Sequence, residues 1–216
     1  MTTAIALLHG QKEIEMENFL SVDWKPGFGK LYVWFAMDKI GNIAMMVNNC
    51  WGDIPKVILS IDNVEEKLET LEGYVWGDIE EYEDYSPKKE GGFYVDIYSS
   101  WRYSTFNSRD ELEKDFIRQF KEHGRSSEVN MVINKGVFVF YAVEGSYEGE
   151  DYPVGYDKKT KMGDYYSFLV PTKFSSIEDF PLELRHFIAV SDEVIFSEDK
   201  VIDNDRIDEL FIKTYI

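Results

Sequence analysis

The chain has 216 residues, of which 44% are hydrophobic and 16% aromatic, and this apolar content excludes an intrinsically disordered protein. Its 41 acidic and 23 basic side chains give a formal net charge of −18, which argues against nucleic acid and anionic membranes as direct ligands. The length allows one globular domain over residues 1–216, which no Pro- or Ser-rich linker divides.

The first predicted element is a β-hairpin. Residues 30–37 and 43–47 are rich in aromatic and branched side chains, and the turn between them contains Gly41 and Asn42, either of which tolerates positive φ. Both arms are almost continuously apolar, so we expect both faces of the hairpin to be covered. Residues 57–61 predict a further strand.

Two capping-box patterns predict helices in the next part of the chain. The first comprises residues 62–65 and is followed by apolar residues at helical spacing, with Gly73 placed to end the helix. The second comprises residues 108–111 and precedes an apolar stripe that ends before Gly124. Residues 93–98 between the two helices predict a strand.

A second hairpin is predicted from residues 128–133 and 137–143, which flank an Asn-Lys-Gly turn. Residues 144–163 then form a loop rich in Gly, Tyr and charge, and loops of this length tend to be functional or mobile.

The last part of the chain predicts two helices and a short strand. A third capping box begins at Ser175, and Pro181 can start a helix that runs through Ile188. Residues 194–196 predict the strand, and residues 205–215 predict a terminal helix. Hairpins dominate over βαβ units in the predicted order of elements. We therefore expect an α+β fold in which a mostly antiparallel sheet, built from hairpins, packs with three to four helices.

No catalytic or metal-binding motif is found in the sequence. Cys50 is the only cysteine, so no intramolecular disulfide can form, which fits a reducing compartment. The three histidines lie apart and form no zinc-binding pattern. No secretory signal or membrane-length apolar run is found. We therefore expect a cytoplasmic, non-enzymatic protein without metal or cofactor.

The acidic residues are concentrated in two segments of the chain. Residues 62–90 hold 11 acids and three bases, and residues 178–209 hold the same numbers, so each segment has a net charge of −8. Such segments suit a basic protein partner, because opposite potentials accelerate association and select partners. Solubility alone is the competing interpretation of this acidity.

Within the first segment, acids are interleaved with aromatic residues, and the 144–163 loop repeats that pattern. Aromatic rings give rigid contact area and carboxylates accept bidentate bonds from arginine, so both stretches are candidate partner-binding sites. The alternative is a solvated acidic loop whose rings pack into the core. The candidate residues are Trp76, Asp78, Glu80, Glu81, Tyr82, Glu83, Asp84, Tyr85, Glu148, Glu150, Asp151 and Tyr152.

The stretch Lys30 to Leu59, KLYVWFAMDKIGNIAMMVNNCWGDIPKVIL, resembles small proteins encoded beside Rhs-type or contact-dependent toxins. These are the immunity proteins of bacterial polymorphic toxin systems. The resemblance implies a protein that binds one cognate toxin domain and blocks its active site or substrate groove. The resemblance does not assign a functional role to any residue of this chain.

Three hypotheses follow. The first is a cytoplasmic immunity protein that inhibits a basic toxin domain. The second is a hydrolase that uses paired carboxylates in a Tyr- and Trp-lined cleft, since such chemistry needs only two carboxylates a short distance apart. The third is an adaptor that binds a basic protein or peptide.

Overall fold

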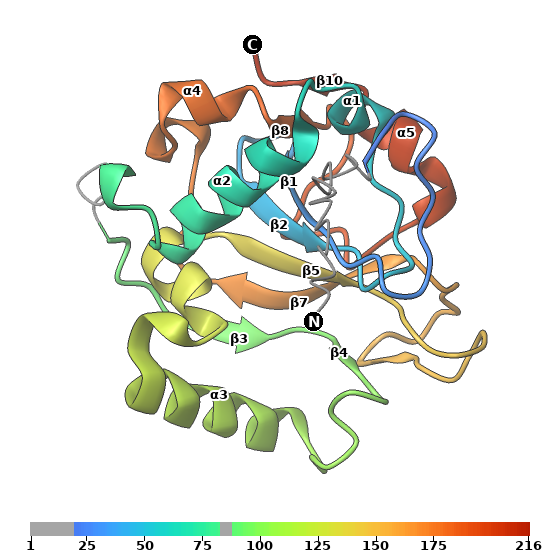
Figure 1. Ribbon diagram of the computed structural model, residues 1–216. Coiled ribbons are helices and arrows are strands. Elements are labelled where there is room, and N and C mark those ends of the chain that lie inside the picture. The colour runs from blue at the N-terminus through green and yellow to red at the C-terminus, as the bar shows by residue number, and fades with distance from the viewer. Residues whose placement is uncertain (1–19, 83–87) are drawn as a thin grey trace, which may run out of the picture.

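The computed structural model describes residues 20–82 and 88–216 (Figure 1). An eight-stranded sheet in the order β10-β8-β1-β2-β5-β7-β3 forms its centre, with β9 paired to β7 beside this path and a separate pair formed by β4 and β6. The strands are β1 Val33–Met37, β2 Ile43–Val47, β3 Phe93–Val95, β4 Tyr98–Ser99, β5 Phe138–Ala142, β6 Pro153–Val154, β7 Tyr165–Pro171, β8 Ile188–Val190, β9 Val201–Ile202 and β10 Lys213–Thr214.

Two long helices and several single turns surround the sheet. The α-helices are α1 Lys56–Leu59, α2 Val64–Trp76, α3 Arg109–His123, α4 Leu182–Arg185 and α5 Ile207–Leu210. The 3₁₀ turns are η1 Glu80–Tyr82, η2 Gly124–Ser126, η4 Ile177–Asp179 and η5 Asn204–Arg206, and η3 Met131–Lys135 is a π-helical turn.

The α+β fold is confirmed, and the sheet is mixed. Strand β1 pairs with β8 in parallel, and β2 pairs with β5 in parallel, while the other pairings along the large sheet are antiparallel. The link from β2 to β5 contains α2 and α3, and a long helical crossover of this kind permits parallel pairing.

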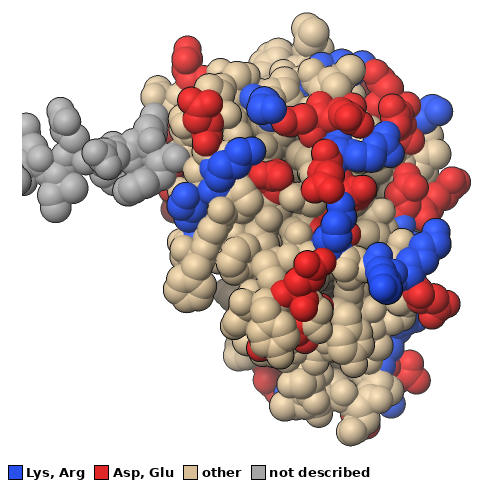
Figure 2. Space-filling model, turned by 90° about the vertical axis from the view of Figure 1, so that its right-hand side faces the viewer, with Lys and Arg blue, Asp and Glu red and all other residues tan. Residues whose placement is uncertain are grey.

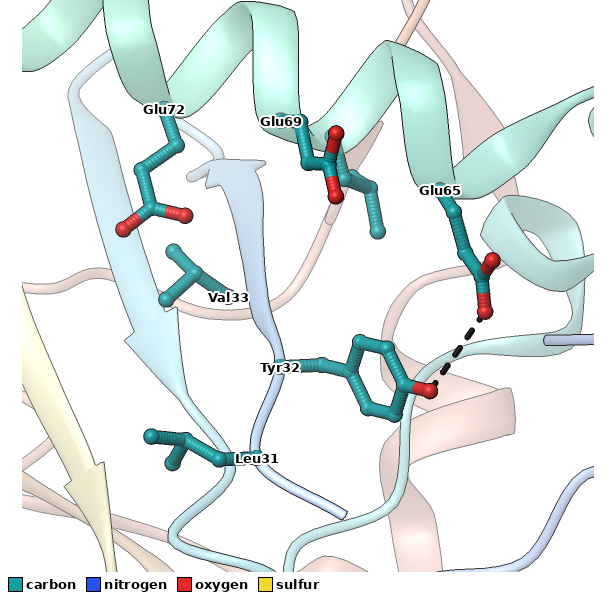
Figure 3. Close-up of a pocket in the computed structure, with 7 residues that line it drawn as sticks. Leu31, Tyr32, Val33, Glu65, Glu69 and Glu72 are labelled. Carbon is teal, nitrogen blue, oxygen red and sulfur yellow. Dashed lines mark hydrogen bonds between the residues drawn. The ribbon is translucent and has the colours of Figure 1, made fainter. Parts of the chain in front are cut away.

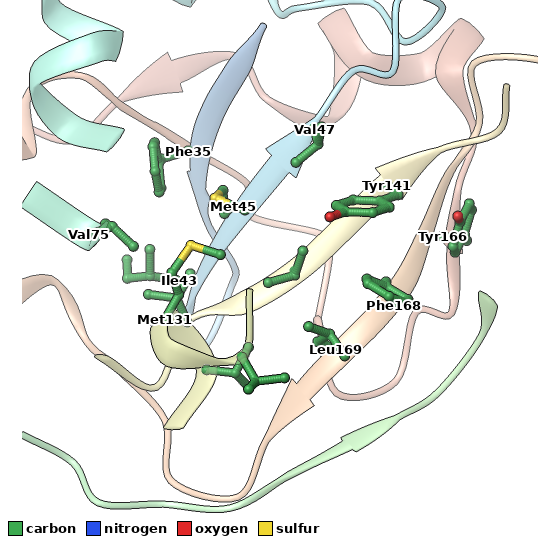
Figure 4. Close-up of a cluster of buried hydrophobic side chains, with 14 of the residues drawn as sticks. Phe35, Ile43, Met45, Val47, Val75, Met131, Tyr141, Tyr166, Phe168 and Leu169 are labelled. Atoms are coloured by element: carbon green, nitrogen blue, oxygen red, sulfur yellow. The ribbon is translucent and has the colours of Figure 1, made fainter. Parts of the chain in front are cut away.

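The sheet is buried on both faces, and alternate residues of each strand enter different cores. In β1, Phe35 packs into one cluster with Val75 of α2 (Figure 4). Leu112 and Phe116 of α3 belong to the same cluster. On either side of Phe35 in the chain, Trp34 and Ala36 pack into the opposite cluster with α1 and α5. The Trp34 indole also donates to the Tyr165 hydroxyl at 3.0 Å, which ties the edge of one core to β7.

The first hairpin matches its prediction. Val33 pairs with Val47 and Met37 with Ile43, and Gly41 adopts a φ of 92° in the turn. The buried Asp38 carboxylate accepts hydrogen bonds from the backbone of Asn42 and Phe196, so it fixes both the turn and the segment after β8.

Two predictions around α2 are wrong. Residues 57–61 form a helical turn rather than a strand, because Ile58 and Leu59 both enter one core from a turn that begins after Pro55. The 62–65 capping box does not form, since Asn63 caps the helix without a side-chain bond and the Glu65 carboxylate binds elsewhere. The helix continues past Gly73 and ends at Gly77, which has a φ of 78°.

Helix α3 matches its prediction, whereas the strands on either side of it differ. The Ser108 hydroxyl accepts from the backbone N–H of Glu111, and Gly124 ends the helix. The predicted strand over residues 93–98 is split into β3 and β4. In the predicted second hairpin only β5 is a strand; residues 128–133 lead through helical backbone into η3. The partner of β5 is instead β7, which the sequence analysis missed.

Near the C-terminus the elements are shorter than predicted. The capping box lies one residue later, at Ser176 and Asp179, and α4 ends before β8 begins at Ile188. Residues 194–196 do not form a strand, and the predicted terminal helix is limited to η5 and α5 before β10.

Substitution of Gly136 tests how η3 is joined to β5. Gly136 has a φ of 72°, and an added Cβ would lie 2.4 Å from the Lys173 carbonyl oxygen, whereas at Gly149, with a φ of 84°, nothing lies within 4 Å. We expect Gly136→Ala to lower the free energy of unfolding by about 3 kcal/mol and Gly149→Ala by about 1 kcal/mol. Urea unfolding of both variants measures the difference. Equal effects would show that the close packing at Gly136 is wrong.

Candidate functional site

The two acidic segments differ in how many of their carboxylates are paired. In residues 178–209, seven of the 11 acids form ion pairs with Lys or Arg. Arg206 serves two of them, and Lys161 two more. Figure 2 shows the side of the molecule on which α5 lies, where acidic and basic side chains are interspersed. The negative charge of this segment is therefore partly neutralised: five basic side chains serve the seven paired acids, and the other four acids form no ion pair with a described Lys or Arg.

The described acids of residues 62–90 form no ion pair with a described Lys or Arg. Three of them, Glu65, Glu69 and Glu72, are spaced four and three residues apart and so share one face of α2. The Trp76 side chain continues this row and hydrogen-bonds to Glu72. These three glutamates were not among the predicted site residues, although their helical spacing was a signal that could have identified them.

The row of glutamates forms one wall of a groove of about 370 Å³ between α2 and the start of β1 (Figure 3). Opposite it lie Leu31, which is 60% exposed, and Tyr32. The Glu65 carboxylate accepts from the Tyr32 hydroxyl at 3.4 Å and from the Leu20 backbone at 2.9 Å, so its position is fixed. The groove thus combines a carboxylate wall with an apolar one.

The surroundings of Glu72 raise the pKa of its carboxyl. Burial raises the pKa of its carboxyl, the hydrogen bond from Trp76 opposes that shift, and the neighbouring charge of Glu69 adds to it. A cation placed between Glu69 and Glu72 would relieve this repulsion and favour the ionised form. The groove is therefore electrostatically suited to a positively charged side chain.

The η1 region continues the negative surface beyond α2. Asp78, Glu80 and Glu81 are exposed. Tyr82 is half-buried, packs edge-on against Tyr74 at 5.7 Å and hydrogen-bonds to Glu183. The predicted site residues Glu83, Asp84 and Tyr85 lie outside the described residues.

Trp76 and Tyr82, which were predicted as partner-binding residues, lie against the core of the protein. Both are half-buried and pack against the core cluster that contains Tyr74. Together they line a hollow of about 350 Å³ between the end of α2 and the end of α3. Their rings are therefore accessible from this hollow.

The candidate residues of the 144–163 loop have different roles. Glu148 and Tyr152 are exposed, and Glu150 binds the backbone of Ser146 within the loop. Asp151 is buried, which corrects its prediction as a partner-binding residue. Its carboxylate accepts hydrogen bonds from the Ser99 hydroxyl at 2.9 Å, from the Ser100 hydroxyl at 3.2 Å and from the Trp101 backbone N–H at 3.2 Å. Asp151 therefore holds the loop against β4 through hydrogen bonds, next to the residues of the loop that form β6.

The structure does not bring the two predicted patches together. The segment from Trp76 to Tyr82 lies beside η3, which precedes β5, and the Asn130 amide reaches the Trp76 carbonyl at 3.4 Å. The 144–163 loop follows the other end of β5 (Figure 1). A partner centred on α2 and η1 would therefore approach a different part of the molecule from the loop.

Two glutamates, Glu128 and Glu144, interact with Arg102 in an aromatic setting. The Arg102 guanidinium lies 2.8 Å from the Glu144 carboxylate and 5.0 Å from the centre of the Tyr141 ring. Burial raises the pKa of Glu128, while Arg102 and a hydrogen bond from Tyr141 lower it. Glu128 Oε2 is buried and has no hydrogen-bond partner in the described part of the chain. This network has the residue types that the hydrolase hypothesis requires.

Comparison with protein-family models, with curated proteins and with solved structures gave no match. Across residues 20–82 and 88–216 no cluster of three or more His, Cys, Asp or Glu side chains has an arrangement that could hold a metal ion. In the same residues, no helix combines the length and the apolar character that crossing a membrane requires.

The protonation of Glu128 predicts a pH dependence of stability. Its pKa is raised in the folded state, so the folded protein loses stability as the pH rises from the ordinary glutamate value through the raised one. Glu128→Gln removes that loss, and we expect it to stabilise the protein by on the order of 1 kcal/mol at neutral pH but not below pH 4. Chemical unfolding between pH 4 and 8 measures this. The matched control is Glu148→Gln on the exposed loop, and parallel pH profiles for wild type and Glu128→Gln would contradict the assignment.

Proposed function

We propose that the protein is a cytoplasmic, non-catalytic immunity protein that binds and inhibits a basic toxin domain. The observation that carries the proposal is the strip of unpaired carboxylates on α2 and η1, here called the acidic strip and comprising Glu65, Glu69, Glu72, Asp78, Glu80 and Glu81. Acidity that served solubility alone would not require the described acids of one segment to be unpaired while seven of the 11 acids in the other are paired.

The acidic strip suits lysine and arginine side chains of a protein partner. The groove beside it is long enough along α2 to face several carboxylates, and Leu31 offers apolar surface to the aliphatic stem of a lysine or arginine. Its glutamates can then accept charge-assisted hydrogen bonds from the head group. Toxins that act on nucleic acids or nucleotides carry basic clefts, which such a strip would cover.

Electrostatic steering is a further reason to place the interface here. A cluster of exposed carboxylates raises the rate of association with a cationic surface, and this rate then depends on ionic strength. The paired carboxylates around α5 contribute less, since the lysines and arginines bound to them offset part of their field. The adaptor hypothesis uses the same strip and differs only in its partner, a basic peptide instead of a folded toxin.

The hydrolase hypothesis is the second candidate, and the Arg102 network is its specific observation. Glu144 is engaged by Arg102 at 2.8 Å, and burial raises the pKa of both Glu128 and Glu144. A catalytic pair needs one free carboxylate beside one protonated carboxyl, and the ion pair with Arg102 limits Glu144 in this role. We therefore place the acidic strip first.

Charge reversal tests the proposed interface. The stoichiometric partner is first purified with the protein from its native host and identified as a basic toxin domain. Affinity is then measured by calorimetry for the triple variant Glu69→Lys, Glu80→Lys and Glu81→Lys. Because each reversal replaces an attraction by a repulsion, we expect binding to weaken by at least a hundredfold.

The matched control is Glu148→Lys, Asp157→Lys and Glu198→Lys, which changes the net charge equally at exposed positions outside the strip. We expect less than a fivefold change in affinity for this control. Equal weakening by both triples would show that net charge alone is recognised. A larger effect of the control triple would place the interface elsewhere and overturn the proposal.

A further inference from the structure

The hollow between α2 and α3 has walls of four different elements. The end of α2, the turn η1, the end of α3 and the π-helical turn η3 enclose its volume of about 350 Å³. Aromatic rings contribute much of the lining. The residues used in the argument are Trp76, Tyr82, Phe120, Asn130, Asn134 and Lys135.

Lys135 brings a positive charge into this aromatic setting. Its ammonium nitrogen lies 4.1 Å from the centre of the Tyr74 ring, a cation–π contact, and its side chain is half-buried. Burial lowers the pKa of Lys135, and the nearby Asp179 opposes that shift. Asp179 is itself bound by Lys89 at 2.7 Å and by the Ser176 backbone. In the described residues, Lys135 therefore has no ion-pair partner of its own.

The two asparagines add polar groups with a definite orientation. The Asn134 amide donates to the Asn130 side-chain oxygen at 2.7 Å, and the Asn130 amide donates to the Trp76 carbonyl. Asn130 thereby connects Asn134 to the end of α2. The side-chain oxygen of Asn134 accepts no hydrogen bond from any described residue. A ligand in the hollow can donate to that oxygen.

We propose that this hollow binds a small molecule with a planar ring and an anionic group, such as a nucleoside monophosphate or an aromatic carboxylate. The ring lies against Trp76 and Tyr82, and the anionic group is placed near Lys135. The volume of about 350 Å³ limits the ligand to a small molecule. This site lies beside the acidic strip and takes a ligand of the opposite charge.

The first test is a fluorescence titration of the full chain with 1-anilinonaphthalene-8-sulfonate, a planar anionic dye. We expect saturable binding of one dye per chain. Lys135→Met is expected to weaken it at least tenfold, whereas Lys135→Arg keeps the charge and retains binding within threefold. The matched control is Lys158→Met on the exposed loop, which is expected to have no effect. Absence of saturable binding, or equal affinity in the two methionine variants, would overturn the proposal.

Competition with the bound dye then tests the chemistry of the ligand. Adenosine monophosphate and phenylacetate represent the two sources of a ring with an anionic group, and displacement by either supports the site and identifies its preference. Adenosine and phenylacetamide are the uncharged counterparts. If these displace the dye equally well, the role of Lys135 is contradicted, and if neither anion displaces it, the ligand class is wrong.

Discussion

The proposed function depends on the amphipathic character of α2, which carries glutamates on one face and buried leucines on the other. Glu65, Glu69 and Glu72 share one face, where like charges at these spacings destabilise a helix by about 0.2–0.5 kcal/mol per pair. The other face buries Leu68 and Leu71, and full burial of a leucine contributes about 2 kcal/mol. Packing therefore exceeds the repulsion severalfold, and the helix can hold unpaired carboxylates in fixed positions.

The same contrast separates the two acidic segments. Around α5, carboxylates are paired with Lys56, Lys161, Arg206 and Lys213, and exposed pairs of this kind contribute little to stability but cancel charge locally. Along α2 and η1 the charges are left uncancelled. The net charge of −18 is therefore distributed unevenly, with ion pairs that offset part of the charge around α5 and none along α2 and η1 in the described residues.

Much of the fold could be predicted from local sequence, and the errors have physical causes. The first hairpin and α3 are specified by residues next to one another, the Gly41 turn and the Ser108 cap. Strand β7 was missed because both its faces are buried, so it lacks alternation, and its pairing with β5 spans a long loop. The turn η3 was predicted as a strand because its apolar run, centred on Val132, satisfies either geometry.

The site was predictable only in part. Asp78, Glu80 and Glu81 are exposed as expected, but ion pairing depends on residues distant in sequence, such as Lys161 with Asp203, and cannot be read locally. The burial of Asp151 likewise depends on hydroxyls of β4 and the residue that follows it. The hollow was not predicted because Asn134 and Lys135 were assigned to the turn of a hairpin, and nothing in the local sequence indicates that they lie near Trp76.

Hydrogen–deuterium exchange of the protein with and without its basic partner tests the central claim most directly. The account predicts that partner binding slows exchange in residues 64–82, which carry the acidic strip, and leaves residues 144–163 and 192–213 unchanged. Protection confined to either of those two segments, with residues 64–82 exchanging as in the free protein, would contradict it.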